Sequence, residues 1–458
     1  MSSPARFAEV APRVRGPLRQ SRAVVARVAS LTKAAPIRSA GWAASGELAG
    51  KCALLLTTVI IARAASPETF GRYVALSAIA MVAAGLWDFG SSTLASKAVA
   101  AGEIRARDAI RDVVRLRAIV VPAWVILFAV TTAIVGVSNP RDFIPFAAVS
   151  LLFASHAPLL GILRGELRFR TVATLWTVGR FVTCVVTLAF ALAPRGLGLQ
   201  EAGWAGVCGE ASTLLLAVAA VLLRSEPAGY RNRRSITFRA SLPLAANGVL
   251  SLAYNRLDVV LLTALAGADQ LDKYGPASRL QDALYVFPYV VTTVALPVLS
   301  RRARAEGSAE VVGRAAVRTS VCGFLFGLLA AGALVFAAPR ALELVLGAGY
   351  RGSAEATRVI VLFLPFSMAV APLLSALISA GRSIDTSKVF GLSFAVSFSL
   401  HVILDPRFGA TGGSVATVAR DVVAVPFAYL LARRAGLVGP ALRRRRLTAA
   451  FARGSQVG

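Results

Sequence analysis

The stretch IIARAASPETFGRYVALSAIAMVAAGLWDFGSSTLASKAVA, from Ile60 to Ala100, joins two apolar segments through a short polar turn around Pro67. A related stretch, LLTALAGADQLDKYGPASRLQDALYVFPYVVTTVALPVLSR, runs from Leu261 to Arg301. At the offset of 201 residues that aligns them, Tyr73 falls on Tyr274. One helix–turn–helix unit in each half indicates a duplicated chain.

Composition places this duplicated chain in a membrane. Of its 458 residues, 56% are hydrophobic and only 16% are charged, whereas a soluble domain carries about 25% charged residues. Apolar runs of about 20 residues, the length that crosses a bilayer, fill most of the sequence. The prediction is an all-α polytopic membrane protein with about twelve transmembrane helices, arranged as two six-helix lobes related by the internal repeat.

The hydrophobic runs also divide the chain. The predicted spans are 40–62, 73–94, 116–137, 143–163, 171–193, 201–223, 240–267, 274–299, 315–338, 356–380, 387–404 and 410–432. The predicted parts are a basic N-terminal tail (1–39), a first lobe (40–223), a basic linker (224–239), a second lobe (240–432) and a basic C-terminal tail (433–458). An even number of spans per lobe gives both copies the same orientation, and such repeats place a substrate site between the lobes.

The formal net charge is +27, and the Lys and Arg residues responsible for it are distributed as the predicted membrane topology requires. With the N-terminus inside, the tails and inward loops hold 36 of the 50 Lys and Arg residues, and the outward loops hold 9. Lys and Arg concentrate in cytoplasmic loops of membrane proteins, so we expect a plasma-membrane protein with both termini cytoplasmic. No nucleic-acid recognition motif accompanies the basic residues, so nucleic acid is not an expected partner.

Short motifs exclude other classes of protein. SGELAGKC, at Ser45–Cys52, lacks both the spacing and the final Ser or Thr of a phosphate-binding loop. Its Gly46-x-x-x-Gly50 pattern, like those at 161–165 and 323–327, is typical of close helix packing. The four cysteines fall within spans and lack metal-ligand spacing. Because the sequence also shows no catalytic triad or paired-carboxylate site, we expect no cofactor, no metal and no enzymatic activity.

Ionisable residues inside the spans are the candidate functional residues. Each costs about 2.5–3.5 kcal/mol at the centre of a membrane helix, so they must be paired or face a water-filled cavity. Glu47 and Lys51 (i, i+4) and Arg279 and Asp282 (i, i+3) have the spacing of helix-surface pairs. The structural alternative is interhelical ion pairs that hold the bundle together. The functional alternative is a cationic cavity for an anionic head group, for which the strongest candidates are Arg180, Arg256 and Arg279.

Pyrophosphate would favour arginine at such a site, because the planar guanidinium binds phosphate oxygens in a bidentate manner. The two histidines, His156 and His401, each stand alone in an apolar span. We expect hydrogen-bonded packing residues there rather than a proton relay.

The first hairpin resembles a known family. Ala62, Arg63, Pro67, Glu68, Phe70, Gly71 and Tyr73, followed by Asp88 and Gly90, match the turn and span end of Wzx-type polysaccharide-unit flippases, in the multidrug/oligosaccharidyl-lipid/polysaccharide exporter superfamily. The run Lys273–Leu280 and the turn Pro406–Gly409 are similar to later parts of that family. The resemblance covers about residues 40–432.

The resemblance implies flipping of a polyprenyl-pyrophosphate-linked oligosaccharide by alternating access, with membrane lipid, a polysaccharide polymerase and glycosyltransferases as expected partners. It implies a phosphate site at Lys51, Arg180, Arg256 and Arg279. The supporting or ion-coupling acids would be Glu47, Asp88, Glu210, Asp258 and Asp282. Alternatives are a cation-coupled multidrug antiporter, a peptidoglycan-precursor flippase, which usually has two more spans, and a non-transporting scaffold of a synthase complex.

Overall fold

The described part of the chain is helical throughout. The computed structural model describes residues 35–100, 104–134, 139–194, 196–223, 236–292 and 309–438, and no strand occurs within these ranges. Nearly all of the predicted N-terminal tail, most of the linker and the end of the C-terminal tail lie outside the described residues.

The helices occur in two halves of the chain, before and after the predicted linker. The first half contains α2 (Ala35–Ala64), α3 (Pro67–Asp88), α4 (Ser91–Ala100), α5 (Ala106–Ile134), α6 (Pro140–Gly165), α7 (Phe169–Leu192) and α8 (Leu199–Leu222). The second half contains α9 (Phe238–Ala266), η1 (Ala268–Gln270), α10 (Leu271–Leu284), α12 (Ala309–Leu346), η2 (Ala348–Ser353), α13 (Ala354–Ile360), α14 (Phe363–Ser379) and α15 (Ser383–Arg434). Residues 286–292 are also helical.

Most of the twelve predicted spans coincide with one helix or part of one, to within a few residues at their ends. The exceptions are 73–94, which runs from α3 into α4, 356–380, which covers parts of α13 and α14, and 274–299, which covers α10 and residues 286–292 and then leaves the described ranges. Within the described ranges, seven helices are long and apolar enough to cross a membrane, and an eighth span results if the bent pair 348–360 and 363–379 is one span. The element α15 covers both of the last two predicted spans, because the chain breaks helical geometry only at Gly409 (φ 52°, ψ −130°).

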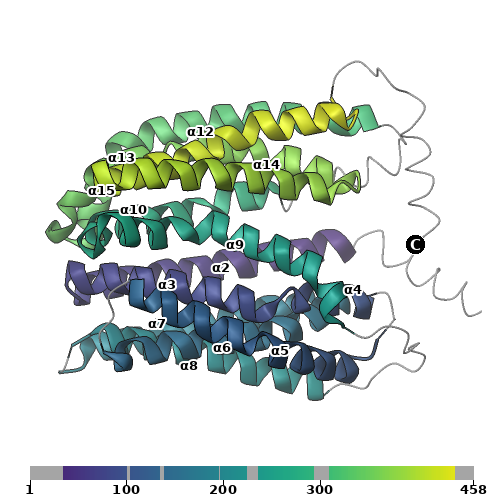
Figure 1. Cartoon of the computed structure of the whole chain (residues 1–458), viewed down its shortest axis with the longest axis horizontal. Coiled ribbons are helices and arrows are strands. Elements are labelled where there is room, and N and C mark those ends of the chain that lie inside the picture. The colour runs from purple at the N-terminus through teal and green to yellow at the C-terminus, as the bar shows by residue number, and fades with distance from the viewer. Residues whose placement is uncertain are drawn as a thin grey trace, which may run out of the picture.

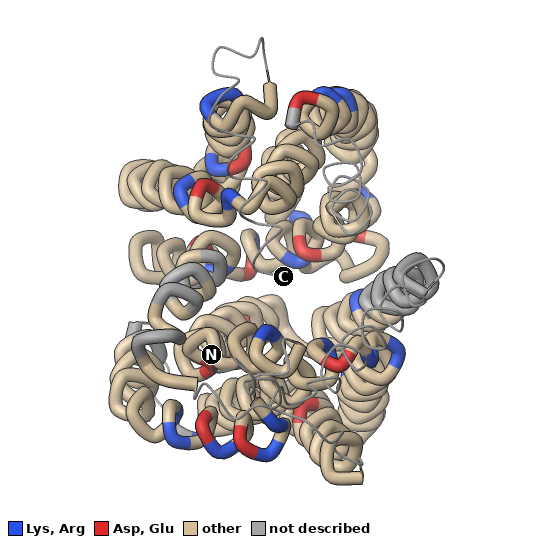
Figure 2. Tube along the Cα trace, turned by 90° about the vertical axis from the view of Figure 1, so that its right-hand side faces the viewer, with Lys and Arg blue, Asp and Glu red and all other residues tan. Residues whose placement is uncertain are grey.

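The two halves form two side-by-side groups of helices (Figure 1), with α2 and α3 of the first half facing α9, α10 and α12 of the second. Figure 2 looks along the helices and shows the same two groups one above the other. The main cluster of buried apolar side chains crosses this boundary and includes Phe70, Leu76, Leu262 and Leu271. The lobes therefore share one continuous apolar contact.

The small-residue motifs pack helices closely, as their spacing predicts. A Cβ added at Gly161 or Gly165 would meet backbone oxygens of α4. One added at Gly46 would meet Ala173 of α7, and one at Gly327 would meet Pro365 of α14. These glycines allow backbones to approach more closely than a side chain would permit.

The second helix of the opening hairpin, α3, ends earlier than the sequence predicts. Ser66 caps α3 by accepting from the Thr69 amide at 3.2 Å, and the helix ends at Asp88 rather than near residue 94. The end results from Phe89 and Gly90, which both adopt positive φ (46° and 71°) that few residues other than glycine tolerate. The chain then restarts as the short helix α4.

The first turn of α9 is attached to the first lobe. Ile236, two residues before α9, donates its amide to the Asp112 carboxylate of α5 at 2.9 Å. Phe238 stacks on Phe89 with ring centroids 4.9 Å apart. The end of the predicted linker therefore packs with the half that precedes it.

Candidate functional site

One buried charged cluster lies within the first lobe. Glu210 of α8 accepts a hydrogen bond from His156 of α6 at 2.7 Å and pairs with Arg180 of α7 at 3.3 Å. The Arg180 guanidinium also lies 4.6 Å from the centroid of the Trp176 ring. His156 is completely buried and Glu210 nearly so. Because Arg180 and Glu210 compensate each other, this cluster supplies both charge balance and helix-to-helix contact.

A second charged cluster lies in the second lobe, at its boundary with the first. Arg256 of α9 and Arg279 of α10 both contact the same oxygen of Asp282, at 2.8 and 3.5 Å. The predicted i, i+3 pair of Arg279 and Asp282 is thus confirmed. The Arg279 guanidinium lies 5.5 Å from the ring centroid of Tyr73, on α3 of the first lobe. Two guanidinium groups sharing one carboxylate leave the cluster with an excess positive charge.

The side chains of this second cluster are partly exposed. The side chains of Arg256, Arg279 and Asp282 are 19%, 11% and 23% exposed. The Arg279 Nε atom is buried without a hydrogen-bond partner. Guanidinium donors that are not used internally are the groups that bind phosphate oxygens. We define Arg256, Arg279 and Asp282 as the arginine cluster.

Two further carboxylates are buried in the second lobe, and one of them, Asp258, lies two residues from Arg256 on α9. Asp258 of α9 accepts from the Tyr274 hydroxyl at 2.5 Å, and that hydroxyl also lies 3.1 Å from Thr417 Oγ1 of α15. Asp405, the second carboxylate, lies 2.7 Å from His401 Nδ1. Each carboxylate has one buried oxygen, Oδ1, without a hydrogen-bond partner. Such unpaired oxygens are costly to bury, so they are candidates for holding a proton or a cation.

The charged core of the second lobe contains a further group that the sequence did not select. Arg420 of α15 donates to the carbonyl oxygen of Tyr254 and to the Tyr285 hydroxyl, and it pairs with the adjacent Asp421. Its guanidinium lies 4.1 Å from the Tyr254 ring centroid. With 2% of its side chain exposed, Arg420 joins α15 to α9 and is not accessible to a ligand.

The other predicted site residues lie elsewhere. Asp88 accepts from Ser91, and from both the amide and the hydroxyl of Ser92. It therefore caps α4, with Arg117 at 3.8 Å. Lys51 is half-buried on α2 and forms no ion pair with the described residues. The side chain of Glu47, its predicted partner, lies outside the described residues.

The four predicted phosphate ligands therefore do not form one site: two lie in the second lobe, and Arg180 and Lys51 lie in the first. The structure brings Arg256 and Arg279 together and places Arg180 with Glu210 in the other lobe. Each of these arginines has a carboxylate neighbour, as the structural alternative requires. Both histidines are hydrogen-bonded to carboxylates, as expected for packing residues. No group of three or more His, Cys, Asp or Glu side chains within the described ranges could hold a metal ion.

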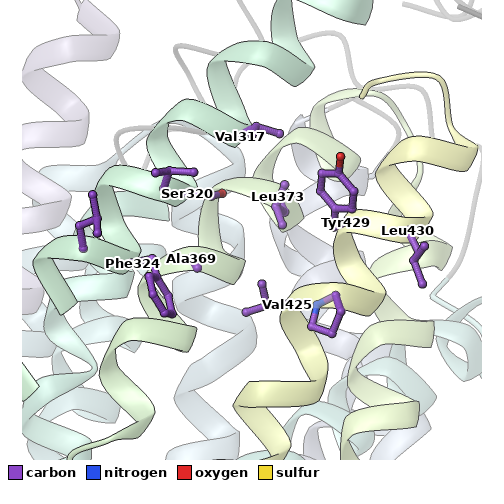
Figure 3. Close-up of a pocket in the computed structure, with 11 residues that line it drawn as sticks. Val317, Ser320, Phe324, Ala369, Leu373, Val425, Tyr429 and Leu430 are labelled. Atoms are coloured by element: carbon purple, nitrogen blue, oxygen red, sulfur yellow. The ribbon is translucent and has the colours of Figure 1, made fainter. Parts of the chain in front are cut away.

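An apolar groove lies on the second lobe, separate from these charges. It has a volume of about 510 Å³ and lies between α12, α14 and α15 (Figure 3). Phe324, Leu373 and Val425 are among its lining residues. An apolar surface of this kind suits the hydrocarbon region of a membrane.

The architecture is that of a class of membrane transporters. A multidrug resistance MATE family transporter of the MOP superfamily, in an inward-facing conformation, matches with a TM-score of 0.67 and 17% identity, over 85% of this chain and 95% of that one. The lipid II flippase MurJ, in an inward closed conformation, matches with a TM-score of 0.65 and 12% identity, over 91% and 90% of the two chains. At these identities the similarity establishes the fold, which is the MOP transporter fold.

A third structure with this fold is a MOP superfamily transporter from Pyrococcus furiosus, with a TM-score of 0.63 and 16% identity over 88% of this chain and 97% of that one. That transporter is described as having a binding pocket of reverse polarity. No curated protein sequence matches the chain. The family model described as "Polysaccharide biosynthesis protein" matches residues 37–302, more than half of the chain. The protein therefore belongs to the polysaccharide biosynthesis protein family, and the predicted Wzx-type resemblance is confirmed.

Proposed function

We propose that the protein flips a polyprenyl-pyrophosphate-linked oligosaccharide across the cytoplasmic membrane for cell-surface polysaccharide biosynthesis. Membership of the polysaccharide biosynthesis family carries this proposal. The MOP transporter fold supports it, because related folds include both drug transporters and a flippase of a lipid-linked precursor. No catalytic step is needed, since the substrate changes sides without a change in covalent structure.

The arginine cluster is the proposed pyrophosphate site. Its two guanidinium groups share a single carboxylate oxygen and so retain an excess positive charge. A pyrophosphate would compete with Asp282 for the same donors, and its higher charge would favour it in a partly desolvated site. Arg180 and Lys51 would contribute from the first lobe. Glu210 would then act as the counter-charge that orients Arg180.

Ion coupling is proposed at Asp258 and Asp405. Each carboxylate has one buried oxygen without a partner, and Tyr274 and Thr417 place hydroxyl groups beside Asp258. A proton or a small cation bound there would compensate the buried negative charge. Asp258 lies two residues from Arg256 on α9, so occupancy of this carboxylate can influence the orientation of Arg256.

In this mechanism the two lobes alternate between exposing the charged region to the inner and the outer side. The glycan and pyrophosphate would pass between the lobes, while the polyprenyl chain would remain in lipid. Both termini would be cytoplasmic, as the distribution of Lys and Arg favours. A polysaccharide polymerase and glycosyltransferases are the proposed partners.

The test is a leaflet-accessibility assay with purified protein in vesicles that contain a fluorescent polyprenyl-linked sugar. We expect the double variant Arg256→Ala/Arg279→Ala to reduce the flipping rate at least about tenfold, because each charged hydrogen bond contributes about 1.5–3 kcal/mol. Arg358→Ala, which removes an exposed arginine of α13, is the matched control. Normal flipping by a normally folded double variant would refute the pyrophosphate site.

A second candidate is a cation-coupled multidrug antiporter, which the fold shared with a MATE family transporter favours. Binding of cationic dyes in place of polyprenyl-linked sugars would support it. A peptidoglycan-precursor flippase would prefer a lipid II analogue as substrate. A scaffold protein would tolerate neutralisation of the whole arginine cluster.

A further inference from the structure

The family-like motif in the first hairpin contacts the second lobe at one end of the helix bundle. Arg63, in the last turn of α2, donates from Nε to the Val345 carbonyl at 2.6 Å and from Nη2 to the Leu344 carbonyl at 2.5 Å. Both carbonyls belong to the last turn of α12, which ends at Leu346. The last carbonyls of a helix lack intrahelical partners and carry partial negative charge, so a guanidinium is well suited to bind them.

A residue of the second lobe makes an equivalent contact with a helix end of the first. The Tyr350 hydroxyl, on η2, donates to the Ala62 carbonyl at 2.9 Å, and Ala62 lies in the last turn of α2. Each lobe therefore caps a helix end of the other. We call these three hydrogen bonds, made by Arg63 and Tyr350, the clasp.

Apolar and small residues of the same motif surround the clasp. Phe70 is completely buried, with its ring edge-on to Tyr350 at 5.6 Å between centroids. A Cβ on Gly71 would lie 3.0 Å from the Asp272 amide nitrogen and 3.0 Å from Leu271 Cβ. Only glycine allows α3 to approach the start of α10 this closely. The motif residues are thus explained by contact between lobes rather than by contact with a substrate.

We infer that the clasp holds this end of the bundle closed and must open once in each transport cycle. The charge distribution places this end on the outer side, so the structure corresponds to a state closed to the outside. Two turns of α3 connect the clasp to the charged site, because Tyr73 lies against Arg279. Movement of the α2–α3 hairpin away from the second lobe would break the clasp at Arg63 and also withdraw Tyr73 from the arginine cluster.

The test measures the distance between the lobes directly and requires no substrate. It presupposes alternating access, but a wrong substrate assignment would not change its outcome. Spin labels are placed at Arg141→Cys on α6 and Glu355→Cys on α13, two exposed positions, in protein whose four native cysteines are replaced by alanine. Pulsed electron paramagnetic resonance in lipid nanodiscs then gives the distribution of distances.

We expect a predominant short distance for the parent protein. Arg63→Gln should raise the ratio of long to short distances about tenfold, and Tyr350→Phe, which removes only the hydroxyl, about fivefold. Arg72→Gln is the matched control, because Arg72 lies on the same hairpin but pairs with Glu68 within its own helix. Distributions for Arg63→Gln and Tyr350→Phe that equal that of Arg72→Gln would overturn the inference. Tyr350→Phe alone decides the matter if Arg63→Gln does not fold.

Discussion

Arg256 of α9 and Asp282 of α10 form an ion pair of 2.8 Å, and Arg279 contacts the same carboxylate oxygen. The pair joins two helices of the second lobe, and within the arginine cluster two guanidinium groups share one carboxylate, with Asp258 two residues from Arg256 on α9. This relationship makes the arginine cluster suited both to stabilising the lobe and to receiving an anion. Experiments can separate the two roles, because an added anion can take the place of the Asp282 carboxylate.

Asp282→Asn should lower the melting temperature of the detergent-solubilised protein, because two neighbouring guanidinium groups lose their shared counter-charge. Removing one partner of a buried pair costs about 3–5 kcal/mol, and partial exposure reduces that cost here. Inorganic pyrophosphate should raise the melting temperature of the variant more than that of the parent, since ligand binding to the folded state stabilises it. Equal effects of pyrophosphate on both proteins would argue against an anion site at this cluster.

Glu210→Gln should destabilise the first lobe through a different mechanism. The change leaves Arg180 without its counter-charge in a nearly buried position, and we expect a loss of about 2–4 kcal/mol. Glu68→Gln provides the comparison, because its pair with Arg72 is exposed and such pairs contribute about 0–1 kcal/mol. Thermal unfolding monitored by tryptophan fluorescence measures both. Similar melting temperatures for the two variants would contradict the prediction.

Gly71→Ala should weaken the contact between the lobes, because the new methyl group would approach the backbone of Asp272 at 3.0 Å. The expected result is a lower melting temperature and a larger share of long distances between the lobes. Gly332→Ala, in the middle of α12, is the control, since a Cβ there meets no atom within 4 Å. Alanine favours a helix over glycine by about 1 kcal/mol, so the control should be as stable as the parent or more so.

Asp258→Asn should uncouple flipping from an ion gradient. Neutralising this carboxylate removes the charge that a bound proton or cation would compensate. Flipping by the parent in vesicles should respond to an imposed proton or sodium gradient, and flipping by the variant should not. Separate proton and sodium gradients identify the coupling ion. A variant that responds as the parent does would exclude Asp258 from coupling.

The orientation of the bundle is testable with reporter fusions. A reporter that is active only in the cytoplasm should be active when fused after Leu437 and inactive when inserted beside Glu68, in the first turn of α3. The opposite pattern would place the clasp on the inner side of the membrane. It would also show that the excess of Lys and Arg does not set the orientation of this chain.

The sequence predicts the helices well because burial in a membrane requires long apolar runs, which are directly visible. The motif residues Asp88 and Gly90 mark the end of the second span, but the apolar run extends the predicted span to residue 94, so α4 is not predicted as a separate helix. Arg279 and Asp282 could be paired from their spacing on one helix. His401 and Asp405 have the i, i+4 spacing that could have revealed their contact.

Contacts between distant helices could not be obtained in this way. His156 and Glu210 are separated by 54 residues, and the capping of α12 by Arg63 joins residues 281 and 282 positions apart. Such pairs depend on how the helices are placed in space, which hydrophobic periodicity does not specify. The division of the predicted cations between the two lobes has the same cause.

The attachment of Ile236 and Phe238 to the first lobe determines where the chain deforms. The first turn of α9 is held by the first lobe, while the helix as a whole contacts both α3 of the first lobe and α15 of the second. A rotation between the lobes that keeps these contacts would bend α9 beyond Phe238, in the segment that contains Pro243 and Gly248. The mechanical compliance of a single transmembrane helix, rather than the length of a loop, would then limit the amplitude of the motion.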